Sequence, residues 1–153
     1  MVRLADLPPA TAKGLRALEL PQLGETVPQG GPPLARRRVA IISTAGLGLR
    51  GDRPFAPGDG DFRILPADAA PDEVVMSHTS VSYDRTGFQQ DLNVAYPLER
   101  LREMAAGGEI GSVGTVHLSV MGATDPARME PHVAEIVRLL RADRIDAALL
   151  VPV

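Results

Sequence analysis

The sequence predicts an α/β fold in which a mostly parallel sheet carries helices on both faces. Two short runs, residues 39–43 and 146–151, are apolar almost throughout, which is typical of strands buried on both sides. Between them, segments with helical spacing of apolar residues alternate with further strand candidates. We therefore expect a flavodoxin-like or Rossmann-like domain, with its chemistry beyond the carboxyl ends of the strands.

Two regions of the chain differ in composition. Residues 1–35 are predicted to form an N-terminal arm or linker, because prolines and glycines between Pro21 and Pro33 prevent regular structure. Within this arm, Thr11–Glu19 is a candidate for a short helix. Residues 36–153 are the predicted α/β domain.

The first half of the domain is predicted to hold three strands. Residues 39–43 form the first, and Gly46–Gly60 follows as a loop rich in glycine, proline and aspartate. Phe62–Leu65 alternates weakly between apolar and polar residues, and Glu73–Ser77 has an apolar centre. Both segments are therefore strand candidates.

The second half is predicted to hold three helices and two strands. Gly87–Tyr96 has helical spacing, and 97–107 begins with a proline and ends with a glycine, as helices often do. Thr115–Val120 alternates between apolar and polar residues, which predicts a strand. Residues 125–140 start with a capping aspartate and continue with a helical apolar stripe, and Asp146–Val151 closes the pattern as a buried strand.

Composition narrows the class of protein. The 153 residues carry a formal net charge of −3, and no basic stripe indicates a nucleic-acid binder. No apolar stretch reaches the roughly 18 residues of a membrane helix, and the start has no apolar signal core, so a cytoplasmic protein without membrane contact is expected. The cysteine count is 0, which excludes disulfides, thiolate metal sites and a cysteine nucleophile within these residues. No cofactor is expected. No metal is expected either, because no spacing typical of metal ligands occurs.

The densest polar run is Ser77–Arg85, which leaves the end of a predicted strand. His78 and Asp84 are the candidate catalytic residues, since an imidazole moves protons near neutral pH and a carboxylate can neutralise an ammonium group. The candidate substrate-binding residues of this run are Ser80, Tyr83 and Arg85. The guanidinium could hold a carboxylate through two hydrogen bonds. The alternative interpretation is structural, with hydroxyls that cap the next helix and an ion pair at the surface. Polar residues that follow are interpreted as an exposed helix face: Gln89, Gln90, Asp91 and Asn93.

The segment Gly46–Gly51 fits the spacing G-x-G-x-x-G after a predicted strand. A dinucleotide site also needs a helix that opens at the third glycine, whereas two prolines soon follow here. An NAD(P)-dependent oxidoreductase is therefore the third hypothesis, and a loop whose backbone approaches a ligand or partner is preferred. Further candidate substrate-binding residues in this loop are Arg50, Asp52 and Arg53.

Five stretches together resemble one protein family. They are Val39–Leu47, Leu49–Phe55, Met76–Arg85, Asp91–Leu101, and Gly108–Gly111 with Met121–Asp125. Over about residues 38–153 they resemble the N-terminal region of the selenoprotein B family of glycine, sarcosine, betaine and D-proline reductases. The resemblance implies reductive cleavage of a C–N bond next to a carboxylate. In the family, a selenolate or thiolate attacks the α carbon. Thiols or a partner protein then regenerate the selenolate or thiolate.

The family's reactive residue follows an apolar strand that corresponds to Asp146–Val151, just before the sequence ends. A nucleophile at the carboxyl end of this strand would face the loops Ser43–Arg53 and Ser77–Arg85, which suggests roles for the candidate residues on physical grounds. Arg50, Arg53 or Arg85 would bind the carboxylate and favour an anionic nucleophile, and His78 would protonate the leaving amine.

We therefore expect a reductase component that is cut short before its selenocysteine or cysteine, for instance at a UGA codon read as stop. Its sheet would then be incomplete at the C-terminus. The expected partners are a small-molecule substrate and either a reductase partner subunit or a thiol reductant, and an incomplete sheet edge favours an oligomer. The alternatives are a split subunit completed by a second chain, and a non-catalytic subunit or small-molecule-binding module of the same fold.

Overall fold

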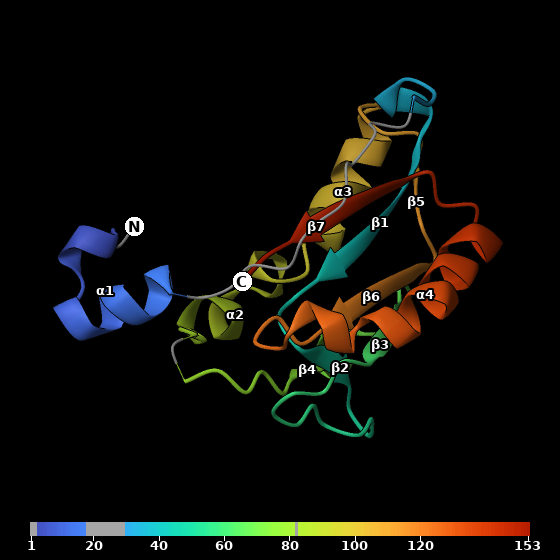
Figure 1. Cartoon of the computed structure of the whole chain (residues 1–153). Helices are drawn as coiled ribbons and strands as arrows, with labels where there is room; N and C mark the ends of the chain where they lie inside the picture. Colours follow the sequence, from blue (N-terminus) through green and yellow to red (C-terminus); the bar gives the residue numbers. More distant parts are fainter. Residues whose placement is uncertain (1–2, 18–29, 82) are drawn as a thin grey trace.

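A computed structural model describes residues 3–17, 30–81 and 83–153 (Figure 1). The described chain is an α/β structure with a mixed, mostly parallel main sheet. The expected fold class is therefore confirmed. Most of the predicted Pro21–Pro33 linker lies outside the described residues, and the division of the chain at residue 35 stays a prediction.

Within the described ranges, five strands form the main sheet. β1 (Arg38–Ser43) lies inside it and pairs in parallel with β7 (Ala147–Val151) along one edge. Along its other edge, β1 pairs in parallel first with β5 (Ser112–Val113) and then with β6 (Val116–Val120). β3 (Phe62–Pro66) adds antiparallel to β6. The parallel strands thus end at one common edge, as the sequence predicted.

The junction between β5 and β6 leaves a gap in the ladder of β1, and His117 fills it. The N–H of Ile41 donates to Nδ1 of His117 at 2.9 Å, so an imidazole nitrogen takes the place of a strand carbonyl. On the same strand, Oγ of Ser119 accepts from the N–H of Leu47 at 2.8 Å. Both polar side chains are 0% exposed. The predicted strand is therefore confirmed, and its alternate polar side chains bond to neighbouring backbone inside the protein.

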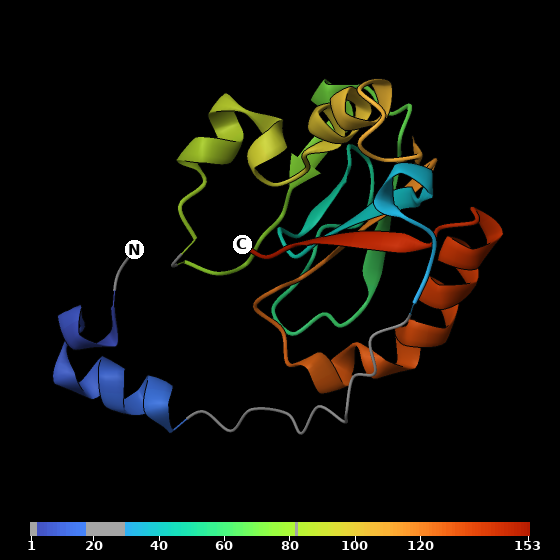
Figure 2. The same cartoon turned by 90° about the horizontal axis from the view of Figure 1, so that it is seen from above.

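Helices cover both faces of the sheet (Figure 2). α3 (Leu98–Ala106) places Leu98 and Leu101 in the hydrophobic core with Ile41 and Leu65. α4 (Glu130–Ala142) has no buried residue. Its predicted apolar stripe is present, but the side chains of that stripe stay partly open to solvent.

β7 is an edge strand and not the buried strand that its composition predicted. Leu149 is 37% exposed and Leu150 is 68% exposed. Within the described residues, β7 pairs only with β1, whereas β1 has neighbours on both sides. An apolar run predicts a strand, but it does not fix the position of that strand in the sheet.

Asp143, directly after α4, ties this helix to the junction of β5 and β6. Its carboxylate accepts from Nη2 of Arg38 at 2.7 Å, from Oγ1 and the N–H of Thr115 at 2.7 and 2.6 Å, and from the N–H of Val116 at 3.1 Å. Its side chain is only 10% exposed. Burial raises the pKa of Asp143, but these hydrogen bonds outweigh burial and lower the pKa to about 2.

A second, two-stranded sheet connects the loops. β2 (Leu47–Leu49) pairs antiparallel with β4 (Val74–Met76). The predicted loop at Gly46–Gly60 therefore begins with a strand, and the predicted strand at 73–77 stands outside the main sheet. No helix opens after Gly51, so the helix that a dinucleotide fingerprint requires does not form there.

The helix predicted over Gly87–Tyr96 is divided in two. α2 (Thr86–Gln90) ends at Asp91, which is extended with φ −148°, and η4 (Leu92–Val94) follows as a 3-10 turn. The carboxylate of Asp91 accepts from the N–H of Asn93 at 2.9 Å and so caps the turn. This local side-chain bond competes with a continuous helix.

The remaining elements are short. They are η1 (Leu4–Asp6), α1 (Pro9–Arg16), η2 (Leu34–Arg36), η3 (Pro71–Glu73) and η5 (Pro126–Arg128). α1 lies apart from the sheet in both views (Figures 1 and 2). Of the helices in the described ranges, none could cross a bilayer.

Candidate functional site

The carboxyl ends of β1, β6 and β7 meet in a tight group of turns. The N–H of Gly122 donates to the carbonyl of Thr44 at 2.9 Å, and the N–H of Val153 donates to Oγ1 of Thr44 at 3.0 Å. A Cβ atom on Gly122 would lie 2.9 Å from the Thr44 side chain. This close approach requires glycine.

Residues 77–81 and 83–85, hereafter the polar loop, lie against this edge. The N–H of Ser77 donates to the carbonyl of Gly46 at 2.9 Å, and Oγ of Ser77 accepts from the N–H of Phe55 at 2.9 Å. A cavity of about 290 Å³ lies between the loop and the sheet edge. It is lined by His78, Ser80, Tyr83, Gly122, Ala123 and Val153. Three of the predicted site residues are thus brought together.

His78 is the buried titratable group of this cavity wall, with 7% of its surface exposed. Its Nδ1 accepts from the N–H of Ser80 at 3.2 Å. Burial and, to a smaller degree, the charge of Arg85 lower the pKa of His78. The imidazole is therefore neutral at pH 7, and the bond at Nδ1 assigns the proton to Nε2. Nε2 has no hydrogen-bond partner among the described residues.

Tyr83 stacks on His78. The ring centroids are 4.9 Å apart and the rings are tilted by 46°. The Tyr83 hydroxyl is also buried without a hydrogen-bond partner in the described part of the chain. Two neighbouring side chains that line one cavity thus each carry an unsatisfied donor. Buried polar groups normally have partners, so this pair is suited to receive an anionic or carbonyl oxygen of a ligand.

Arg85 and Asp84 act within the loop itself. Nη2 of Arg85 donates to the carbonyls of His78 at 2.6 Å and Ser80 at 3.2 Å, so the guanidinium braces the loop from within. The carboxylate of Asp84 accepts from the N–H of Thr86 at 2.9 Å, at the start of α2. Both side chains therefore have structural contacts, but these are with backbone groups and not with each other, as the structural alternative had proposed.

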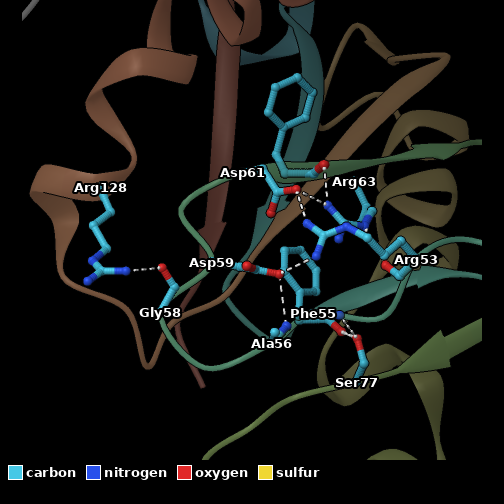
Figure 3. A network of polar contacts seen from close by, with 11 residues as sticks. Arg53, Phe55, Ala56, Gly58, Asp59, Asp61, Arg63, Ser77 and Arg128 are labelled. Atoms are coloured by element: carbon cyan, nitrogen blue, oxygen red, sulfur yellow. Dashed lines mark hydrogen bonds and ion pairs between the residues drawn. The ribbon is translucent and has the colours of Figure 1, made fainter.

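The three candidates of the glycine-rich loop are not among the residues that line this cavity. Nη2 of Arg50 donates to the carbonyl of Asp72, and the carboxylate of Asp52 accepts from the N–H of Leu49 at 2.8 Å. Arg53 forms ion pairs with Asp59 at 3.1 Å and Asp61 at 2.7 Å, in a network that closes the loop before β3 (Figure 3). These charges are already paired or engaged with backbone.

The acidic and histidine side chains are the groups that a metal ion would need as ligands. Within residues 3–17, 30–81 and 83–153, no group of three or more His, Cys, Asp or Glu side chains could hold a metal ion.

Comparison with known proteins decides the family. The family model of the glycine/sarcosine/betaine reductase selenoprotein B matches residues 61–153, which is more than half of the sequence. The chain belongs to the selenoprotein B family. The match contains the polar loop, η4, α3 and β7, and so includes the whole lining of the cavity.

A curated relative of this selenoprotein B family chain is the D-proline reductase subunit gamma of Acetoanaerobium sticklandii. The two are 30% identical over 115 residues, which cover 73% of this chain and 47% of the relative. The chain thus spans about half the length of the curated relative that it matches. No solved structure matches it significantly.

Sequence reasoning missed part of the cavity of this selenoprotein B family chain. Gly122, Ala123 and Val153 line it through their place at the strand ends. The rule that chemistry lies beyond the carboxyl ends of parallel strands indicates Met121–Asp125 and the last residues of the sequence as part of the site region. It does not single out Gly122, Ala123 or Val153 as site residues, because they carry no polar side chain.

Proposed function

We propose that the chain is a component of a reductase that cleaves a C–N bond next to a carboxylate in a small amino acid or related zwitterion. Membership of the selenoprotein B family supports this role, and the matched relative is named as a subunit of D-proline reductase. In this proposal the polar loop and the carboxyl edge of the sheet form the substrate-facing wall.

The observation that carries the proposal is the pair of unsatisfied donors on His78 and Tyr83. The Nε2–H of a neutral imidazole and the phenol hydroxyl together can hold the two oxygens of a carboxylate. The lowered pKa of His78 favours this hydrogen-bonding role over that of a protonated imidazolium acid. The cavity of about 290 Å³ suits a ligand of few atoms.

The reactive nucleophile comes from outside these residues in this proposal, because the sequence has no cysteine. In the cleavage, a selenolate or thiolate forms a bond to the α carbon, the C–N bond breaks, and the amine leaves with a proton. A thiol then takes the selenium or sulfur, and the α carbon gains a proton. The two electrons come from a dithiol that ends as a disulfide.

The test uses the reductase assembled from this chain and the remaining polypeptides of its natural enzyme. Tyr83→Phe removes one donor and is expected to raise KM for the carboxylate substrate about tenfold, which corresponds to the roughly 1.4 kcal/mol of one hydrogen bond. His132→Gln, on α4, is the matched control and should leave KM unchanged. An unchanged KM in Tyr83→Phe would contradict the proposed carboxylate contact.

The pH profile provides a second readout. If neutral His78 holds the carboxylate, kcat/KM falls as the pH decreases through a pKa below 6.5. His78→Gln keeps an N–H donor but cannot be protonated in this pH range. The variant's kcat/KM should therefore not show the decrease at acidic pH. Selenium analysis and intact mass of the natural enzyme determine which polypeptide carries the nucleophile. An active enzyme without selenium and without a reactive cysteine would overturn the assignment of the reaction.

A further inference from the structure

A second cavity lies away from the polar loop's cavity, and none of the functional roles above uses it. It has a volume of about 230 Å³ and lies between the η3–β4 segment and the beginning of α3. Its polar wall includes Asp91, Asn93, Tyr96, Glu99 and Arg102. The wall therefore comes from Asp91–Leu101, one of the stretches that carry the family resemblance, and from the next turn of α3.

Tyr96 brings an unsatisfied hydroxyl to this wall. The residue is only 3% exposed, and its hydroxyl has no hydrogen-bond partner among the described side chains and backbone. Burial raises the pKa of Tyr96, so the phenol is neutral, and the Arg102 guanidinium is the charge that acts on it. Tyr96 and Arg102 both line this cavity.

Asn93 presents an unsatisfied acceptor. Its Nδ2 donates to Oδ1 of Asp91 at 2.9 Å and to Oε2 of Glu99 at 3.1 Å. Two carboxylates can only accept, so these bonds fix the orientation of the amide. Its Oδ1 is buried and has no partner in the described structure. This arrangement leaves an amide oxygen, a phenol oxygen and two carboxylates for a ligand that donates hydrogen bonds.

The charged residues of the cavity wall determine which charge a ligand should carry. Asp91 and Glu99 bring two negative charges to this wall, against one positive charge from Arg102, which donates to the carbonyl of Ala67. Arg100, which is not a lining residue, lies 3.8 Å from the Glu99 carboxylate. A cation is favoured beside two carboxylates, whereas a carboxylate would be repelled. The rest of the wall is apolar and includes Val74 and Leu98. The ligand should therefore combine a positive nitrogen with a small apolar body.

We propose that this second cavity binds a small organic ammonium ion that carries no carboxylate. An acceptor of Asn93 or Tyr96 receives an N–H group of the ammonium, the carboxylates of Asp91 and Glu99 balance its charge, and Val74 and Leu98 contact its alkyl groups. The volume is below the roughly 300 Å³ at which drug-sized pockets begin, so only a few heavy atoms fit. The inference rests on this wall alone and does not depend on the reductase proposal.

Titration of the ¹⁵N-labelled 153-residue chain with trimethylammonium chloride tests the proposal by NMR. The expected result is saturable shifts of the Asn93 side-chain amide and of the backbone amides from Asp91 to Arg102, with a Kd on the order of 1 mM for so small a ligand. tert-Butanol, which has a similar size and no charge, should bind at least several-fold more weakly. Betaine, which adds a carboxylate, should also bind more weakly.

Matched variants on one helix separate charge recognition from general effects. Glu99→Gln should weaken trimethylammonium binding about tenfold, whereas Glu103→Gln, which removes a carboxylate of α3 outside the cavity, should not change it. Far-UV circular dichroism verifies that both variants are folded. Equal binding of tert-butanol, equal effects of the two variants, or shifts confined to the polar loop would each overturn the proposal. None of these outcomes bears on the carboxylate contacts of His78 and Tyr83, so the two proposals fail independently.

Discussion

Replacement of Asp143 by Asn is the sharpest test of how the sheet is held together. The carboxylate accepts four hydrogen bonds, from Arg38, Thr115 and Val116, where β5 passes into β6. Asparagine has the same side-chain shape, but an NH2 group replaces one carboxylate oxygen. This NH2 group would face the N–H or O–H donors that the oxygen accepts from. The substitution therefore leaves donors unsatisfied at a site that is largely closed to water.

The magnitude follows from the pKa of Asp143. The pKa falls from 3.8 to about 2 on folding, so the ionised form contributes roughly 2.5 kcal/mol at neutral pH. Donors left without partners add to this value, and we expect Asp143→Asn to lower the free energy of unfolding by about 2–4 kcal/mol. Because the folded pKa is the lower one, the contribution is complete above the unfolded pKa and is lost as the pH falls through about 2.

Urea unfolding measured by far-UV circular dichroism is the suitable assay, since the chain has no tryptophan. The difference between the wild-type protein and Asp143→Asn should be constant above pH 5 and shrink between about pH 4 and 2. Glu135→Gln serves as control, because it removes an exposed carboxylate whose ion pair with Arg138 lies on the surface of α4. The reasoning is refuted if the variant loses less than about 0.5 kcal/mol, or if the difference does not change with pH.

Three further predictions concern buried and edge residues. Burial lowers the pKa of His117 to about 4, so the wild-type protein should lose roughly 3 kcal/mol of stability as the pH falls from 6.5 to 4, and His117→Gln should lose markedly less over that range in the same urea assay. Gly46→Ala should destabilise more than Gly51→Ala, because both have positive φ but only the former places a Cβ 2.7 Å from Met121; equal melting temperatures would contradict this. Leu150→Lys should reduce self-association of the chain through the edge of β7 in sedimentation velocity, and an unchanged distribution would argue against pairing at this edge.

Much of the framework could be predicted from residues whose effect is local. The apolar run of β1 indicates a strand with two neighbours, and Pro97 and Gly107 stand at the two ends of α3 as expected. The position of the polar loop followed from the rule that parallel strands end at one edge. These features depend on backbone geometry and burial, which the pattern of the sequence carries directly.

The roles of the charged residues could not be predicted, because they depend on partners that are distant in sequence. Arg85 turns inward to the carbonyls of its own loop, and Arg53 pairs with two aspartates before β3. The sequence shows these guanidinium groups but not which acceptors the fold brings to them. Asn93 was interpreted as part of an exposed helix face, yet the extended backbone at Asp91 turns it toward two carboxylates at a cavity.

The bond between Ile41 and His117 makes one rung of the sheet depend on the identity of a side chain. Where a rung joins backbone to backbone, a substitution changes packing without deleting a hydrogen bond. At position 117, only a residue with an acceptor at the reach of Nδ1 can complete β1, and leucine of similar size would leave the N–H of Ile41 unpaired. Sequence variation should therefore be narrower at this interior position than at the apolar positions that flank it in β6.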